Sequence, residues 1–202
     1  MIKYILSALF AGIAVGYVNN NYGNVFANVW ISDYVFTASL ILLLFVMGLA
    51  FGIDKESITK LRQTGPRILI IPLSTALGSI CAGAIGGLIL GISPIASATV
   101  SAGYGWYTLA GPMVWQIFGA EWGALGFATN FLREILTIIT APVMRRVDKY
   151  APIASGGATS MDTTLPVIVR YSGSDMLVAS FASGLILTAV APFSIIAIAS
   201  LR

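Results

Sequence analysis

The chain has 202 residues, of which 57% are hydrophobic and only 9% are charged, and its formal net charge is +3. Soluble domains carry about 25% charged residues, so this composition excludes a water-soluble globular protein. The chain contains no histidine, which excludes the usual zinc and haem sites, a Ser-His triad and a histidine proton relay. We therefore expect a multi-pass protein of the cell membrane, embedded in the lipid bilayer, with no metal, no cofactor and no nucleic-acid partner.

Five apolar runs are expected to cross the roughly 30 Å hydrocarbon core of a bilayer as helices. They cover residues 3–18, 34–53, 67–91, 122–144 and 176–200. In the third run Gly83, Gly87 and Gly91 recur every four residues, which predicts a helix face that another backbone approaches closely. The fold class expected is an all-α integral membrane protein, with residues 1–202 forming a single membrane transport domain.

Two further stretches, about 93–119 and 153–173, are apolar but interrupted by glycine and proline. Continuous helices are not expected there. The basic loops on either side of the third and fourth runs, at 55–67 and 145–149, should both be cytoplasmic, which requires an even number of crossings between them. Both broken stretches are therefore predicted to enter and leave the membrane on one side. The same rule places the N-terminus in the cytoplasm and the C-terminus outside.

The run 122–144 contains a polar stripe. Asn130, Arg133, Glu134 and Thr137 stand at positions i, i+3, i+4 and i+7, so they share one helix face. A charge at the centre of a membrane helix costs about 2.5–3.5 kcal/mol on insertion scales, so it needs a partner or a wet cavity. One interpretation is that Glu134 faces a hydrated path and binds a cation. The alternative is that Arg133 and Glu134 are buried in ion pairs that only fix helix register.

An acidic residue also lies inside the second broken stretch. Asp162 is surrounded in sequence by hydroxyl residues, among them Thr159, Ser160 and Thr163, which can satisfy backbone groups freed by the break. Irregular backbone at membrane depth is tolerated where it is buried in protein or lines a cavity. Asp162 is therefore predicted to lie at a cavity, and an N-cap of a half-helix beginning near Thr163 is a compatible alternative.

The first broken stretch places aromatic rings next to unwound backbone. Gly103 and Gly105 bracket Tyr104, and Trp106 and Tyr107 follow at once. Aromatic faces attract cations, so these rings are candidates for the wall of a cation site. Ordinary aromatic packing, or a belt at the membrane interface, is the alternative.

Three segments carry a resemblance to a known family: SAGYGWYTLAGP at 101–112, TNFLREI at 129–135 and GGATSMDTTLPVIVR at 156–170. They resemble the LysO-type lysine exporters, in order along about 37–200. The resemblance implies export of L-lysine and toxic lysine analogues from the cytoplasm, rather than an enzymatic activity. It places the family's intramembrane acids on Glu134 and Asp162, and it also matches Gly103, Gly105, Trp106, Tyr107 and Gly111.

The resemblance also bears on partners, because full-length members carry additional spans ahead of the matched region. We expect either a short companion membrane protein or a homo-oligomer to supply them. A lysine site needs paired carboxylates, aromatic faces and a donor-rich point for the substrate carboxylate, for which Arg133 or a half-helix N-terminus is a candidate. Proton exchange at one acid would make the protein an antiporter. The competing hypotheses are a non-transporting subunit of a split carrier and an intramembrane hydrolase that uses Glu134 and Asp162 as a dyad.

Overall fold

The computed structural model describes residues 10–12, 14, 15, 17, 18, 34–53 and 69–202, and the described part is helical without strands. The chain divides into two compact units, residues 1–53 and 54–202. In the first unit the predicted second run forms helix α3 (Phe36–Ile53). Most of the predicted first run lies outside the described residues. The all-α fold class is confirmed, while the number of crossings stays a prediction.

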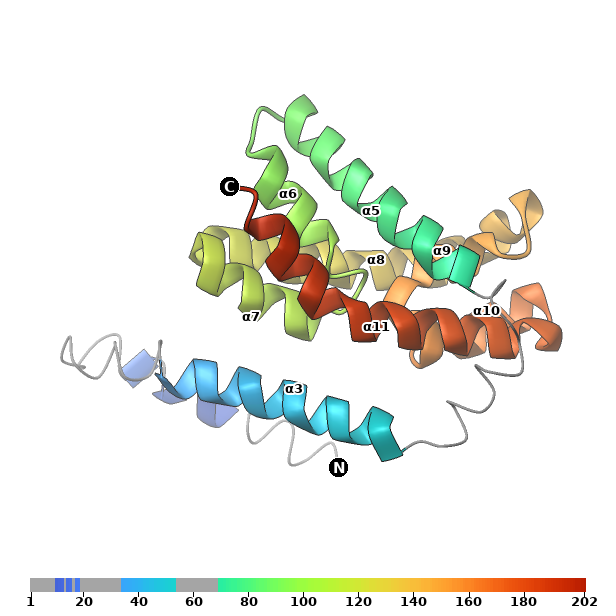
Figure 1. Ribbon diagram of the computed structural model, residues 1–202. Helices are drawn as coiled ribbons and strands as arrows, with labels where there is room; N and C mark the ends of the chain where they lie inside the picture. Colours follow the sequence, from blue (N-terminus) through green and yellow to red (C-terminus); the bar gives the residue numbers. More distant parts are fainter. Residues whose placement is uncertain (1–9, 13, 16, 19–33, 54–68) are drawn as a thin grey trace. The chain divides into compact units, whose positions relative to one another are not determined.

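The second unit contains three long helices, α5 (Ile70–Ile89), α8 (Ala120–Val147) and α11 (Leu177–Ala199) (Figure 1). With the short η4 (Ser174–Met176) ahead of α11, these are the helices that are long and apolar enough to cross a membrane among the residues described. Helix α8, at 28 residues, extends about 42 Å at 1.5 Å per residue, which is more than the hydrocarbon core requires.

Both broken stretches are broken in the structure. The first forms α6 (Pro94–Ser101) and α7 (Tyr107–Phe118), separated by residues 102–106. The second forms α9 (Ala151–Gly156), the 3-10 turn η3 (Gly157–Met161) and α10 (Leu165–Ser172). Pro94 and Pro166 stand in the first turns of α6 and α10, where a missing backbone N–H costs nothing.

The first broken stretch turns back on itself. Helix α6 runs antiparallel to α5, because a Cβ on Gly87 would meet Ser97 and Pro94 at the start of α6 and a Cβ on Gly83 would meet Ser101 at its end. The predicted close face of the third run is thus confirmed at these two glycines. After the break, α7 returns to the end of the unit where Arg202 donates a 2.7 Å hydrogen bond to the Ile117 carbonyl.

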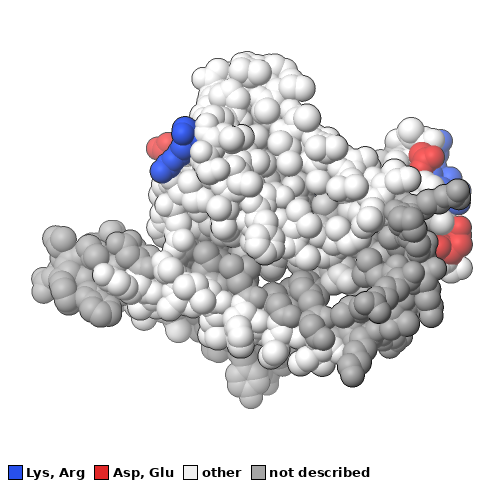
Figure 2. All heavy atoms as spheres, viewed as in Figure 1, with Lys and Arg blue, Asp and Glu red and all other residues white. Residues whose placement is uncertain are grey.

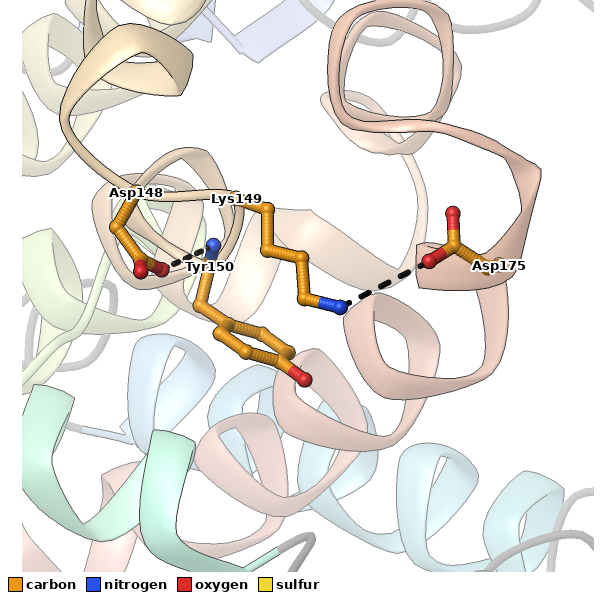
Figure 3. Close-up of polar contacts among 4 residues, drawn as sticks. All are labelled: Asp148, Lys149, Tyr150 and Asp175. Carbon is orange, nitrogen blue, oxygen red and sulfur yellow. Dashed lines mark hydrogen bonds and ion pairs between the residues drawn. The ribbon is translucent and has the colours of Figure 1, made fainter.

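The second broken stretch turns back from the opposite end. There Lys149 Nζ lies 3.9 Å from Asp175 Oδ2, and the Asp148 carboxylate accepts a 2.7 Å hydrogen bond from the Tyr150 amide at the turn into α9 (Figure 3). A buried cluster of Ile153, Ile168 and Met176 joins α9, α10 and the 3-10 turn η4.

Charged side chains collect at these two ends. On the face shown in Figure 2, the coloured charges form two separate groups with a wide uncharged surface between them. Large apolar side chains of the second unit, such as Leu77, Leu88, Ile139 and Phe193, are well exposed. An uncharged band with polar ends is the surface that a bilayer requires.

Candidate transport site

The two broken stretches meet inside the second unit at their tips. The first tip is residues 102–106, between α6 and α7, and the second tip is residues 154–162, which cover the end of α9 and η3. The amide of Ala158, in η3, donates a 2.8 Å hydrogen bond to the carbonyl of Tyr104, between α6 and α7. Tyr104 is fully buried and has a φ of 52°, in the left-handed region that is rare for residues other than glycine. Gly157 has a φ of 61°, and a Cβ there would collide with the Tyr104 carbonyl. The contact therefore depends on left-handed backbone conformations at Tyr104 and Gly157, which few residue types other than glycine adopt.

Asn130 holds the first tip in place. Its Oδ1 accepts a 2.7 Å hydrogen bond from the Gly105 amide, and its Nδ2 donates to the carbonyls of Val100, at 2.9 Å, and Gly126, at 2.8 Å. Asn130 is 2% exposed, and a Cβ on Gly103 would lie 2.8 Å from its Nδ2. Asn130, Gly103 and Gly105, all predicted as transport-site residues, thus form the support of the break.

Arg133 binds the second tip. Its Nε donates to the Ser155 carbonyl and its Nη2 to the Ala154 carbonyl, each at 2.8 Å, and its Nη1 donates to Ser79 Oγ on α5, also at 2.8 Å. Two of these acceptors are carbonyls in the last turn of α9, which have no partner within the helix. Among the described residues Arg133 makes no ion pair, so the alternative that Arg133 is buried in an ion pair that only fixes helix register is not seen in this part of the chain.

Thr159 and Ser160 satisfy backbone groups within the second tip, as their neighbourhood in the sequence predicted. Thr159 Oγ1 donates to the Gly156 carbonyl at 2.9 Å, and Ser160 Oγ lies 2.7 Å from the Gly157 carbonyl. Ser160 also exchanges hydrogen bonds with Ser180 of α11: each hydroxyl donates to the other residue's carbonyl, at 3.0 and 2.7 Å. Both residues are buried, so they stabilise the tip and its contact with α11.

The two acids lie near one aromatic residue. The carboxylates of Glu134 on α8 and Asp162 after η3 both act electrostatically on the phenol of Tyr107, the first residue of α7. Tyr107 also packs edge-to-face on Phe127 and Phe131 of α8, with ring centroids 5.3 and 5.4 Å apart. Tyr107 therefore takes part in aromatic packing, which was the alternative, and its role in the wall of a cation site stays a prediction. Trp106 precedes it as the N-cap of α7, and its ring is half-buried.

The two acids differ in exposure and in hydrogen bonding. Glu134 is half-buried, and its Oε2 is buried without a hydrogen-bond partner among the described residues. Asp162 is exposed, and its Oδ1 accepts a 2.6 Å bond from the Thr163 amide. The N-cap of α10 is Thr164, so capping of that helix does not explain the carboxylate of Asp162.

Comparison with known proteins decides the family. A family model described as "Lysine exporter LysO" matches residues 6–199 of this chain. The chain belongs to the LysO lysine exporter family. It is similar to the "Lysine exporter LysO" of Escherichia coli, at 32% identity over 157 residues, and to the "Putative lysine exporter" of Haemophilus influenzae, at 26% identity over 195 residues. No solved structure matches the chain.

The two relatives differ in how much of them is matched. The similarity covers 78% of this chain and 52% of the E. coli protein, so the chain spans about half the length of that relative. It covers 95% of this chain and 95% of the H. influenzae protein. Three segments of this LysO family member resemble the family. The first contains the first tip, the second contains Glu134, and the third contains Asp162 and most of the second tip.

The sequence analysis missed two features of the site in this LysO family member, one on α11 and one on α5. On α11, Ser180, Gly184 and Thr188 recur every four residues, and a Cβ on Gly184 would lie 2.5 Å from the Met161 amide nitrogen. This small-residue spacing was a usable signal for close packing. Thr75 and Ser79 of α5 gave no such signal, because isolated hydroxyls are common in membrane helices.

Proposed function

We propose that this LysO family member exports L-lysine and lysine analogues from the cytoplasm. The observation that supports the proposal is the buried Oε2 of Glu134, which has no hydrogen-bond partner among the described residues, with Tyr107 within electrostatic range of both Glu134 and Asp162. Two negative charges and an aromatic ring attract an ammonium group, and lysine carries two. The relatives named as lysine exporters support the substrate class.

In the proposed mechanism an ammonium group of lysine binds between the acids. The buried, unpartnered Oε2 of Glu134 accepts a hydrogen bond from it, and the exposed Asp162 receives it from the aqueous side. An unpaired buried carboxylate is costly, and the bound ammonium group removes that cost. Exchange of a proton at one of these acids would make the protein an antiporter.

Efflux of radiolabelled L-lysine from preloaded cells lacking other exporters tests the proposal. Glu134→Gln should abolish efflux while the protein remains in the membrane. Glu121→Gln is the matched control, because Glu121 is an exposed acid at the start of the same helix. Efflux retained by Glu134→Gln, or lost equally in both variants, would contradict the role assigned to Glu134.

The same assay addresses partners. We propose that the chain acts as a single transport domain, with a cytoplasmic N-terminus and an external C-terminus, as a homo-oligomer or with a short companion membrane protein. Efflux by the chain alone would show that the chain needs no companion, and efflux only after co-expression of a neighbouring short membrane protein would support the companion. No efflux in either setting would favour a non-transporting role.

A further inference from the structure

A cavity of about 730 Å³, widely open to the surface, lies between α5, α8 and α9, on the Arg133 side of α8. Its polar lining includes Thr75, Ser79, Ser101, Thr129, Arg133 and Ser155. Small-molecule sites commonly enclose about 300–1,000 Å³. Neither Glu134 nor Asp162 lines this cavity, so it is distinct from the acidic site described above.

The guanidinium in this cavity has unused capacity. Of the five N–H donors of an arginine, Arg133 uses three, on Ser79, Ala154 and Ser155, and every one of these acceptors is formally neutral. A membrane-buried positive charge held only by neutral groups among the described residues is the natural partner of an anion. A carboxylate matches the fork of the guanidinium best, because it accepts two parallel hydrogen bonds.

A second side chain in the cavity independently indicates a missing ligand. Thr75 of α5 is 6% exposed and lines the cavity, and its Oγ1 has no hydrogen-bond partner among the described residues. Leaving a buried hydroxyl unsatisfied costs about 1–3 kcal/mol, so such a group calls for a partner. An acceptor bound at Arg133 would provide one.

Buried residues separate this cavity from the acids. Going round α8 from Arg133 to Glu134, the intervening face carries Asn130 and Thr137, which are 2% and 0% exposed. Asn130 is bonded to the first tip, and Thr137 Oγ1 lies 2.7 Å from Ser155 Oγ. Asn130 and Thr137 therefore stand between the Arg133 side and the Glu134 side of α8.

We propose that the cavity between α5, α8 and α9 binds the carboxylate of an α-amino acid, with Arg133 as its charge partner and Thr75 as a hydroxyl donor. The amino-acid part rests on the proposed export function, whereas the carboxylate part rests on the cavity alone. The apolar stem of the substrate would lie along the aliphatic lining, which includes Ala82, Leu132 and Leu136.

Three ligands separate the carboxylate from the ammonium groups. L-Lysine has both, L-norleucine has the α-carboxylate without the ε-ammonium group, and 1,5-diaminopentane is lysine without its carboxylate. Their affinities for the purified full chain in detergent are measured from ligand-dependent thermal unfolding. The key variant is Thr75→Val, which keeps the shape of the side chain and breaks no hydrogen bond among the described residues. Thr140→Val, on α8 outside the cavity lining, is the matched control.

Thr75→Val should weaken binding of lysine and of norleucine by the same factor, roughly tenfold for a hydrogen bond to a charged group. It should leave diaminopentane binding and the unliganded melting temperature unchanged or slightly raised. Arg133→Lys should weaken norleucine less than Arg133→Gln does. Unchanged norleucine binding in Thr75→Val, or an equal loss for diaminopentane, would overturn the proposal, as would no norleucine binding by the wild-type chain. Norleucine binding that depends on Thr75, in a chain that exports no lysine, would uphold the carboxylate site and refute the export function.

Discussion

The carbonyl of Tyr104 accepts the amide of Ala158 at 2.8 Å, so one hydrogen bond joins two chain segments that enter the unit from opposite ends. Two residues of α8, Asn130 and Arg133, bind backbone groups of the segments that this bond joins. The two acids, Glu134 and Asp162, make no such bonds to the other segment among the described residues. Mutations at the contact should therefore affect stability, and mutations at the acids should affect transport. The following predictions separate the two effects.

Gly157→Ala should destabilise the fold. Gly157 has a φ of 61°, and the added Cβ would collide with the Tyr104 carbonyl and lie 3.1 Å from the guanidinium of Arg133. Gly91→Ala is the control, since Gly91 has a φ of 69° but nothing within 4 Å of the added Cβ. Backbone strain costs about 1–3 kcal/mol in each variant, and the collision adds to it in Gly157→Ala alone. Melting temperatures in detergent should fall more for Gly157→Ala, and equal losses would contradict the tip contact.

Asn130→Ala should cost at least about 2 kcal/mol, because it leaves the buried Gly105 amide and the Val100 carbonyl without the side-chain partner they have now. Chemical unfolding in mild detergent measures the loss. Thr129→Ala, at the exposed neighbouring position, should change stability by less than about 0.5 kcal/mol. A small loss for Asn130→Ala would mean that Asn130 does not support the break.

Tyr107→Phe should preserve stability and impair transport. The ring packs edge-to-face on Phe127 and Phe131, and phenylalanine keeps that packing while removing the hydroxyl near the two acids. Tyr107→Leu, which loses the ring as well, should also lose about 0.5–1.5 kcal/mol per aromatic pair. Lysine efflux and melting temperature are measured side by side. Normal efflux by Tyr107→Phe would assign Tyr107 to packing alone.

The pair Lys149–Asp175 should contribute little. Its atoms are 3.9 Å apart, and the two side chains are 43% and 66% exposed. Exposed ion pairs are worth about 0–1 kcal/mol and are screened by salt. A double-mutant cycle with Lys149→Gln and Asp175→Asn should give a coupling energy below about 0.5 kcal/mol that falls further in 0.5 M salt. A coupling energy above 1 kcal/mol would show that this end is more tightly organised than its exposure suggests.

Sequence patterns predicted the main elements. Glycine located the two breaks, which the structure has at residues 102–106 and around η3, whereas the predicted interruption at Pro112 is wrong because Pro112 lies inside α7. The basic loops led to the prediction that each broken stretch returns to the end from which it starts. The contact of Lys149 with Asp175, which flank the second stretch, agrees with it there. These predictions succeed because backbone hydrogen bonding and the cost of burying charge act locally along the chain.

The sequence by itself determined that Asn130, Arg133, Glu134 and Thr137 share one face of a helix, because their spacing sets their angles around its axis. Only the tertiary structure decided what each of them does. Asn130 and Arg133 bind backbone groups of the two tips, while Glu134 keeps a buried oxygen without a partner among the described residues. Helical spacing states where a side chain points, but its role depends on which distant segment packs there. Here that segment is one of two irregular tips whose conformation rests on long-range contacts.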